Sequence, residues 1–197
     1  MSKDVFKTGI MFIIFVFFSG GALFAVEFGD KIDKADDCYQ QGRYIDAVDN
    51  LKDAVKIAWE AAALSARNIN FVEDGNSGFQ KFVVREDRPF AGGENIIIYL
   101  EPVGFSVEER EDSYFAHLET DYELLDSESR ELAKEQEFGD FEIEDTTFFT
   151  DISLNLNFSF TGLIDGNYTL KIIIRDVLSG EEYILTKDFK FAQNPDE

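Results

Sequence analysis

The sequence is poor in the residues that most often carry catalysis and cross-linking: its 197 residues include one cysteine and one histidine. Because a single cysteine, Cys38, cannot form a disulfide within the chain, packing alone must hold the fold together. Cys38 falls in an expected helix, where a small buried apolar role explains it best. Neither a Ser-His-Asp nor a Cys-His site has a strong candidate. We therefore expect no catalytic residue, no cofactor, no metal and a non-enzymatic protein.

Basic residues are scarce as well, since 18 Lys and Arg stand against 40 Asp and Glu, for a net charge of −22. A charge of this sign repels nucleic acids and anionic lipid headgroups, and it attracts basic partners or divalent cations. Apolar residues are not scarce: they make up 45% of the chain and include 21 Phe. This content is enough for a hydrophobic core, so the sequence indicates a folded acidic protein rather than a disordered one.

The first residues form a targeting segment. Lys3 and Lys7 precede an uncharged run from Thr8 to Val26, in which the small residue Ala25 stands just before Val26. This order is typical of a secretory signal peptide, and we expect residues 1–25 to be removed after Ala25. An uncleaved anchor is the alternative, because the run is close to the roughly 17–25 residues that a membrane-spanning helix needs. The remaining chain is then periplasmic or secreted, or it is held by one membrane span outside the cytoplasm.

Two helices are expected next, over Asp30–Gln41 and Tyr44–Asn68, with Gly42 supplying the left-handed residue that ends the first. On the second helix the small or apolar residues recur at spacings of three and four and form one stripe: Ala47, Leu51, Ala54, Ala58 and Ala61. An adjoining and bulkier stripe consists of Val48, Val55, Trp59 and Ala62. The breadth of this apolar arc indicates that the helix contacts more than one neighbour.

This pair of helices resembles a single tetratricopeptide repeat. The matching positions are Ala35, Gly42, Tyr44, Ala47, Leu51 and Ala54. Trp59 departs from the family because a proline usually ends the second helix there, and one unit alone does not form the peptide groove of a multi-repeat protein. The hairpin therefore either packs on its own β-domain, with Trp59 as the main anchor, or offers Val48, Val55 and Trp59 to a protein partner.

From Phe79 onward the hydrophobic pattern changes to the period of two that is typical of strands. Strands are expected over Phe79–Val84, Glu94–Leu100, Tyr114–Leu125, Ile152–Phe160, Tyr168–Arg175 and Glu182–Phe191. Arg130–Gln136 fits either a short edge strand or a helical turn. About seven short strands separated by turns predict an antiparallel β-sandwich. The chain is thus α+β, with a signal or anchor helix at 1–25, a hairpin at 26–74 and a sandwich at 75–197.

The run Asp165-Gly166-Asn167-Tyr168 resembles the entry to the sixth strand of immunoglobulin-like domains. The resemblance implies that the Tyr168 hydroxyl bonds back to the preceding connection, and that Gly166 and Tyr168 are structural residues. The later Asp176–Gly180 turn looks like the final hairpin of bacterial immunoglobulin-like modules. The cysteine pair and core tryptophan of antibody domains are absent from this region, so the resemblance implies only the general sandwich.

Four polar or glycine-containing segments are candidate ligand sites. His117, Glu119 and Asp121 share one strand face, which suits zinc but also ordinary polar alternation. The acidic loop Glu108–Asp112 could hold calcium weakly, yet it lacks the spacing of a dedicated loop. Gly92-Gly93 enters a strand rather than the helix that a phosphate-binding loop requires. Tyr99–Phe105 is either a binding rim or a simple strand exit.

Two functions from different classes remain. The first is an interaction or scaffold module of the bacterial cell envelope that binds another protein through the sandwich or the hairpin. The second is a hydrolase, or a carbohydrate- or calcium-binding module, that uses acidic loops at one end of the sandwich. We expect the first, because the residues offer broad surfaces and no catalytic constellation.

Overall fold

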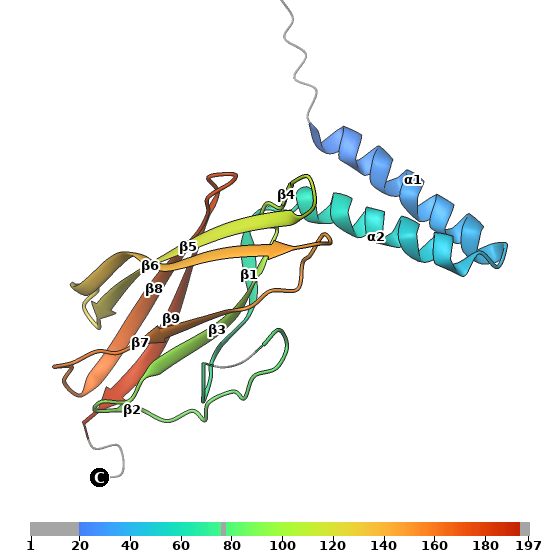
Figure 1. Cartoon of the computed structure of the whole chain (residues 1–197). Coiled ribbons are helices and arrows are strands. Elements are labelled where there is room, and N and C mark those ends of the chain that lie inside the picture. Colours follow the sequence, from blue (N-terminus) through green and yellow to red (C-terminus); the bar gives the residue numbers. More distant parts are fainter. Residues whose placement is uncertain (1–19, 76–77, 194–197) are drawn as a thin grey trace, which may run out of the picture. The chain divides into compact units, whose positions relative to one another are not determined.

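The computed structural model describes residues 20–75 and 78–193, and residues 1–19, 76–77 and 194–197 lie outside the described part. The fold is α+β, with two helices and two sheets (Figure 1), which confirms the predicted class. The chain divides into two compact units, Met1–Ala54 and Val55–Glu197. Among residues 20–75 and 78–193, no helix combines the length and the hydropathy that a membrane crossing requires. Most of the expected targeting segment, up to residue 19, lies outside the described residues.

The first unit contains helix α1 (Gly20–Gln40) and the first part of helix α2 (Tyr44–Glu60). The turn between them has a left-handed Gly42, with φ of +73°. The Gly42 N–H donates to the Tyr39 carbonyl, and the Arg43 N–H donates to the Cys38 carbonyl. This pair of bonds is a Schellman motif, which satisfies the last carbonyls of α1 and requires a residue that tolerates positive φ. Gly42 therefore ends the helix in the way that the sequence indicates.

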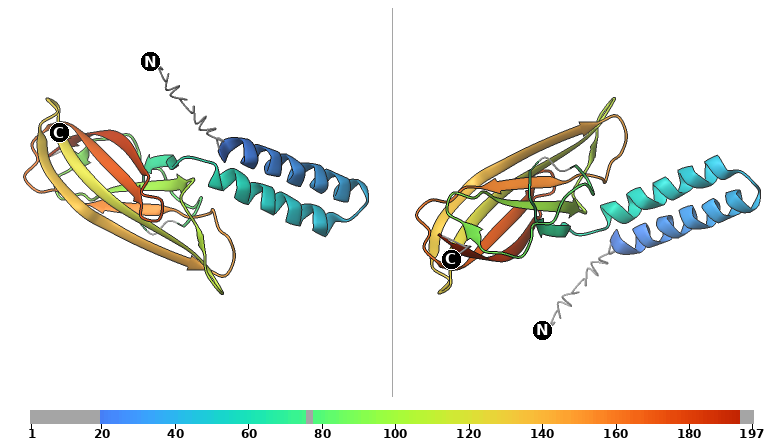
Figure 2. Two further views of the ribbon diagram at one scale, coloured as in Figure 1. Left: turned by 90° about the horizontal axis from the view of Figure 1, so that it is seen from above. Right: turned by 90° about the horizontal axis from the view of Figure 1, so that it is seen from below.

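Helices α1 and α2 run side by side in the first unit (Figures 1 and 2). Among the side chains of this unit that the structure describes, at residues 25–54, the buried ones are all small: Ala35, Cys38, Ala47 and Ala54. Small side chains allow two helix backbones to approach closely, and the Lys31–Asp53 ion pair joins the two helices at their surface. The expected burial of Cys38 is confirmed, since it is 5% exposed.

Helix α2 ends at Glu60, eight residues before the predicted end at Asn68, and strand β1 (Ser65–Phe71) follows it. The Leu64 N–H donates to Oε2 of Glu181, at 3.0 Å, so it is not available to a helix. Residues of β1 then pair with a strand that lies some thirty positions further along the chain. The long-range pairing of β1 with β3 outweighs local helix propensity here. Periodicity is a local signal, so it does not predict such pairing.

The smaller sheet has the order β1-β3-β7, where β3 is Ile96–Val103 and β7 is Leu154–Phe158. Both neighbours of β3 are antiparallel to it. Residues Ile96 to Pro102 are all buried, because one face of β3 meets the main core while Ile97 and Tyr99 on the other face pack with Val72 and Phe82. The predicted strand Phe79–Val84 is not formed; among the described residues this segment makes only isolated bridges, Val72–Val84 and Gly78–Lys81.

The larger sheet has the order β2-β9-β8-β5-β4, and β6 also pairs with β5. Its strands are β2 (Phe90–Ala91), β4 (Glu108–Glu109), β5 (Tyr114–Asp126), β6 (Glu131–Asp145), β8 (Gly166–Asp176) and β9 (Glu182–Ala192). Strands β5, β8 and β9 lie within two residues of the predicted bounds. Strand β6 is far longer than the short strand or helical turn expected at Arg130–Gln136, because it pairs with β5 over almost its whole length.

The main hydrophobic core lies in the second unit, and both sheets contribute to it. Ile98, Leu100 and Leu156 come from the smaller sheet, and Leu118, Leu124, Leu170 and Ile172 come from the larger one. Burying a large apolar side chain contributes roughly 1.5–3 kcal/mol. This shared core therefore holds the two sheets together in a chain where the described part has no disulfide.

Candidate functional site

Trp59 is anchored in the second unit. Its indole N–H donates to the Phe105 carbonyl, with 2.9 Å between Nε1 and the oxygen. Its ring meets the ring of Phe105 edge to face, with centroids 5.0 Å apart. Phe105 is itself buried in the main core. Tyr99, Leu100 and Glu101, the first residues of the Tyr99–Phe105 segment, belong to β3 and are fully buried, which favours the strand exit over the binding rim.

The other two predicted docking residues, Val48 and Val55, are 50% and 53% exposed. Tyr44, Val48 and Leu51 follow one another at spacings of four and three, so they lie on one face of α2. Their exposed fractions are 60%, 50% and 47%. We refer to these three residues as the α2 stripe. The small residues Ala47 and Ala54 are buried on the neighbouring arc of the same helix, so the stripe is an apolar surface left open beside a packed one.

Tyr168 donates its hydroxyl hydrogen to the Ile164 carbonyl, at 2.7 Å, and the Ile164 N–H donates back to the Tyr168 oxygen at 3.2 Å. The ring is buried and stacks on Phe189. Gly166 does not have positive φ, and a Cβ at this position would meet Tyr168 at an ordinary contact distance of 3.8 Å. The structure thus gives Tyr168 a clear packing and hydrogen-bonding role, but it does not require glycine at 166.

His117, Glu119 and Asp121, the candidate zinc ligands, do not converge on one point, because His117 pairs with Asp140 and the two carboxylates pair with Arg175. His117 Nε2 lies 2.7 Å from Asp140 Oδ1 on β6. Glu119 and Asp121 each accept a hydrogen bond of 2.8 Å from the Arg175 guanidinium. Hydrogen bonds to Asp121, Glu119 and Glu182 raise the pKa of Arg175, which keeps it charged. Within the described ranges, no three side chains of His, Cys, Asp or Glu come together in a way that suits a metal ion.

The acidic loop is partly neutralised by cations of the same unit. Lys56 pairs with Glu109 at 3.1 Å, and Arg110 pairs with Glu108 at 3.0 Å. A calcium ion needs several free carboxylate or carbonyl oxygens directed at one point. Two of the four carboxylates in this loop already have a basic partner, so the arrangement does not favour calcium.

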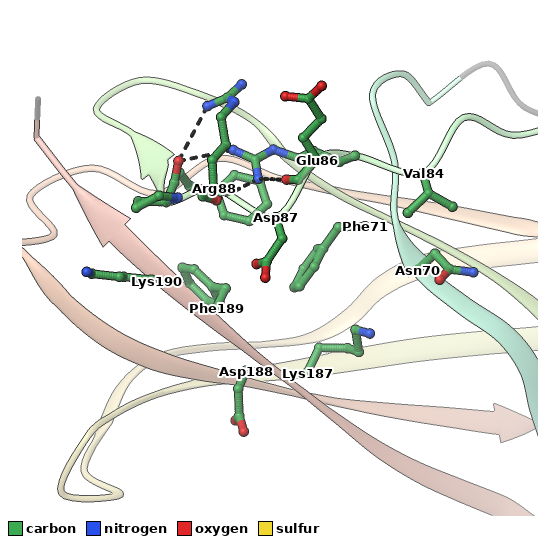
Figure 3. A pocket seen from close by; sticks show the side chains of 13 residues that line it. Asn70, Phe71, Val84, Glu86, Asp87, Arg88, Lys187, Asp188, Phe189 and Lys190 are labelled. Carbon is green, nitrogen blue, oxygen red and sulfur yellow. Dashed lines mark hydrogen bonds between the residues drawn. The ribbon is translucent and has the colours of Figure 1, made fainter. Parts of the chain in front are cut away.

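A cavity of about 370 Å³ lies where the end of β1 and residues 84–90 meet β9 (Figure 3). Its floor is aromatic: Phe71 and Phe90 meet edge to face at 5.2 Å, and Phe90 and Phe189 do so at 5.7 Å. Its rim carries charges of both signs, from Asp87, Lys187, Asp188 and Lys190. Sequence reasoning did not find this cavity, because its walls come from three segments that only tertiary packing brings together.

Buried Arg85 shapes the wall that residues 84–90 form. Its guanidinium donates to the carbonyls of Glu86, Arg88 and Pro89, and to Glu94 Oε1. The Arg85 guanidinium also lies 3.7 Å from the centre of the Phe90 ring. Although burial alone would raise the pKa of Glu94, hydrogen bonds from the Ala91 N–H, Arg88 and Arg85 hold it below its usual value. These contacts hold the segment in a defined curved path.

No protein-family model and no curated protein matches this sequence. Among solved structures, the chain is similar to Pseudomonas fluorescens alkylpurine DNA glycosylase AlkC bound to DNA containing an abasic site analog. The TM-score is 0.36 and the identity is 11%, over 71% of this chain and 32% of the glycosylase chain. The chain thus spans about a third of that protein's length.

The glycosylase is an enzyme, and this finding contradicts the prediction of a non-enzymatic protein. That prediction is corrected, and the chain is not assigned to the non-enzymatic class. At a TM-score of 0.36 the likeness carries neither an activity nor a nucleic-acid ligand over to this chain.

Proposed function

We propose that this chain is an exported, acidic interaction protein of the bacterial cell envelope. In this proposal a tetratricopeptide-like hairpin precedes an immunoglobulin-like β-sandwich, and the hairpin binds another protein through the α2 stripe. The single observation that carries the proposal is the exposure of Tyr44, Val48 and Leu51 side by side on one helix face. Clustered apolar side chains in water are unfavourable, and a protein partner would relieve that cost.

Two observations support the immunoglobulin-like part of the proposal. The two sheets share one core, as the layers of a sandwich do. The bond from Tyr168 to the Ile164 carbonyl, just before β8, has the form of a tyrosine corner. The absence of a cysteine pair in this region is compatible with the sandwich, since its core contains many large apolar residues.

The net charge of −22 bears on the partner. Charge complementarity speeds association and selects partners of opposite sign. A partner with an apolar centre and a basic surround therefore fits best. The charge also argues against stacking of the hairpin on a second copy of the same chain.

Export is supported by the uncharged run from Thr8 to Val26 and its small-residue exit. N-terminal sequencing of the protein recovered from outside the cytoplasm should begin at Val26. An intact Met1 in the membrane fraction would indicate the anchored alternative. Protein found only in the cytoplasm would contradict export altogether.

Docking through the α2 stripe is tested by replacing Val48 with Asp. Envelope extract is passed over immobilised wild-type protein, over Val48→Asp, and over Ile164→Asp as a matched exposed apolar-to-Asp control at 74% exposure. We expect a partner that wild type and Ile164→Asp retain and that Val48→Asp loses, with similar melting temperatures for all three. Equal retention by Val48→Asp would contradict docking through this stripe.

A further inference from the structure

Strand β9 has one paired edge and one open edge. Its residues Glu182 to Phe191 pair with β8 along the whole strand. On the opposite side, β2 pairs with Phe191 and Ala192 alone. In the part of the chain that the structure describes, no strand pairs with residues Glu182–Lys190 on that side. An open edge presents backbone N–H and C=O groups to any extended chain that runs alongside it.

Strand β2 indicates how such a chain would lie, because it already docks on this edge in the parallel sense. The residues that precede β2, at 84–89, run toward the same edge without pairing with it. In this segment the carbonyls of Glu86, Arg88 and Pro89 accept hydrogen bonds from the Arg85 guanidinium. Buried Arg85 thus holds residues 84–89 by contacts within the segment, and this segment does not pair with β9.

The cavity lies directly beside this open edge. Lys187 to Lys190 of β9 form one wall, and residues 84–90 form the other. Figure 3 shows Asp87 directed toward the space between Phe71 and Phe189. A second hollow of about 530 Å³ shares Asp87, Asp188, Phe189 and Lys190 with the first and continues toward Thr169 and Ser127. An added strand would thus find a side-chain pocket next to its backbone path, which is the usual combination in strand-addition sites.

We propose that the open edge of β9 accepts an extended segment of a partner protein as an added strand, parallel to β9 and in line with β2. One apolar side chain of that segment enters the cavity above Phe71, Phe90 and Phe189. The cavity rim carries charges of both signs and so selects neither. The chain as a whole carries a charge of −22, and for this reason the flanks of the partner segment are basic. The same net charge disfavours a second copy of this chain as the occupant.

This proposal rests on the proposed function, since it names a second surface and the form of the partner segment. The probe is a random peptide library displayed on phage and selected on the folded full chain. Selected peptides are then synthesised, and their affinities are measured by fluorescence anisotropy.

Two substitutions close the cavity without removing a buried group. Asp87→Trp places a large ring at a solvent-exposed position that points into the cavity, and Val84→Trp does so from a position that is 55% exposed. Ile164→Trp adds the same ring at an exposed site outside both hollows. We expect both cavity substitutions to weaken peptide binding by more than tenfold and the control to leave it unchanged, with melting temperatures close to wild type.

Strand addition has a signature that simple pocket binding lacks. N-methylation of alternate peptide nitrogens should abolish binding, and amide hydrogens of Glu182–Lys190 should exchange more slowly in the complex. Peptides that bind Asp87→Trp and Val84→Trp as well as wild type, or a library without a binder, would overturn the proposal. If Val48→Asp is the only variant that loses peptide binding, the peptides bind to the α2 stripe. That result would overturn strand addition at β9 and leave the proposed function standing. A dimer that Asp87→Trp dissociates would identify a second copy as the occupant and would also overturn it.

Discussion

The hydroxyl of Tyr99 donates to Glu101 Oε1 at 2.7 Å, and both side chains are completely buried on β3. The other carboxylate oxygen accepts from Arg67 Nε at 3.0 Å and from Asn68 Nδ2 at 2.9 Å. Asn68 has φ of +52° at the irregularity where the register of β1 against β3 shifts. Glu101 on β3 therefore fixes the bulge in the neighbouring strand β1. Three hydrogen-bond donors, from Tyr99, Arg67 and Asn68, stabilise its negative charge.

Replacing Glu101 with Gln should lower the free energy of unfolding by about 2–3 kcal/mol at pH 7, because the hydrogen bonds to a charged acceptor are lost and the new NH2 group of Gln faces a donor where a carboxylate oxygen had accepted. Burial alone would raise the pKa of Glu101, but hydrogen bonds from Tyr99, Asn68 and Arg67 hold it below its ordinary value of 4.5. The carboxylate therefore stabilises the fold above about pH 4.5 and loses this effect as the pH falls through its lower folded-state pKa.

Denaturant unfolding of wild type and Glu101→Gln at several pH values measures this effect. The difference between the two proteins should be largest near pH 7 and should shrink below pH 4.5, the ordinary value for Glu101. Glu111→Gln in the exposed acidic loop is the control and should match wild type throughout. A difference that stays constant down to pH 3 would show that the charge of Glu101 is not responsible.

Trp59→Ala should reduce the free energy of unfolding by about 3 kcal/mol, since it removes a large ring from the edge of the main core. Trp59→Phe keeps a ring against Phe105 but loses the 2.9 Å bond to its carbonyl, and should cost about 1 kcal/mol. Val55→Ala on the exposed face of the same helix should change stability by less than about 0.5 kcal/mol. Equal effects of Trp59→Ala and Val55→Ala would contradict the anchoring role.

Tyr168→Phe should cost about 1 kcal/mol, because it removes the 2.7 Å bond to the Ile164 carbonyl and leaves the ring stacking in place. Tyr44→Phe is the matched control, since Tyr44 is 60% exposed and its hydroxyl can bond to water. Urea unfolding curves of the two variants decide the matter. An unchanged midpoint for Tyr168→Phe would show that the corner bond contributes nothing to stability.

Gly104 and Gly180 have almost the same backbone conformation, with φ of +75° and +76°, but different surroundings. A Cβ at Gly180 meets nothing within 4 Å, whereas one at Gly104 would lie 2.6 Å from the Ala63 carbonyl oxygen. Gly180→Ala should therefore lower the free energy of unfolding by about 1–2 kcal/mol, because the positive φ is the only unfavourable feature for alanine there. Gly104→Ala should cost about 1–3 kcal/mol more, because the backbone after α2 must move. Thermal melting of both variants provides the test, and equal shifts would argue against the close approach.

Several elements could be read from the sequence because their signals are local. The alternation in Tyr114–Leu125, Tyr168–Arg175 and Glu182–Phe191 predicted strands that the structure forms with nearly the same bounds. Gly42 marked the end of the first helix, where its φ is positive. By contrast, the α2 stripe was not predicted: the sequence grouped Leu51 with the alanines and Val48 with Val55 and Trp59, because the pattern does not say which arc a neighbour covers.

The sequence by itself determined the α+β class, the turn at Gly42 and the main strands of the larger sheet, because periodicity and φ preference act between near neighbours. The tertiary structure alone decided that α2 stops at Glu60 and that Ser65–Phe71 becomes a strand, because β1 pairs with β3 across the chain. It also decided the length of β6, which depends on its pairing with β5. The cavity beside β9 and the buried charge of Glu101 arise in the same way. Each needs residues that are distant in sequence and are adjacent only after the two sheets have packed on their shared core.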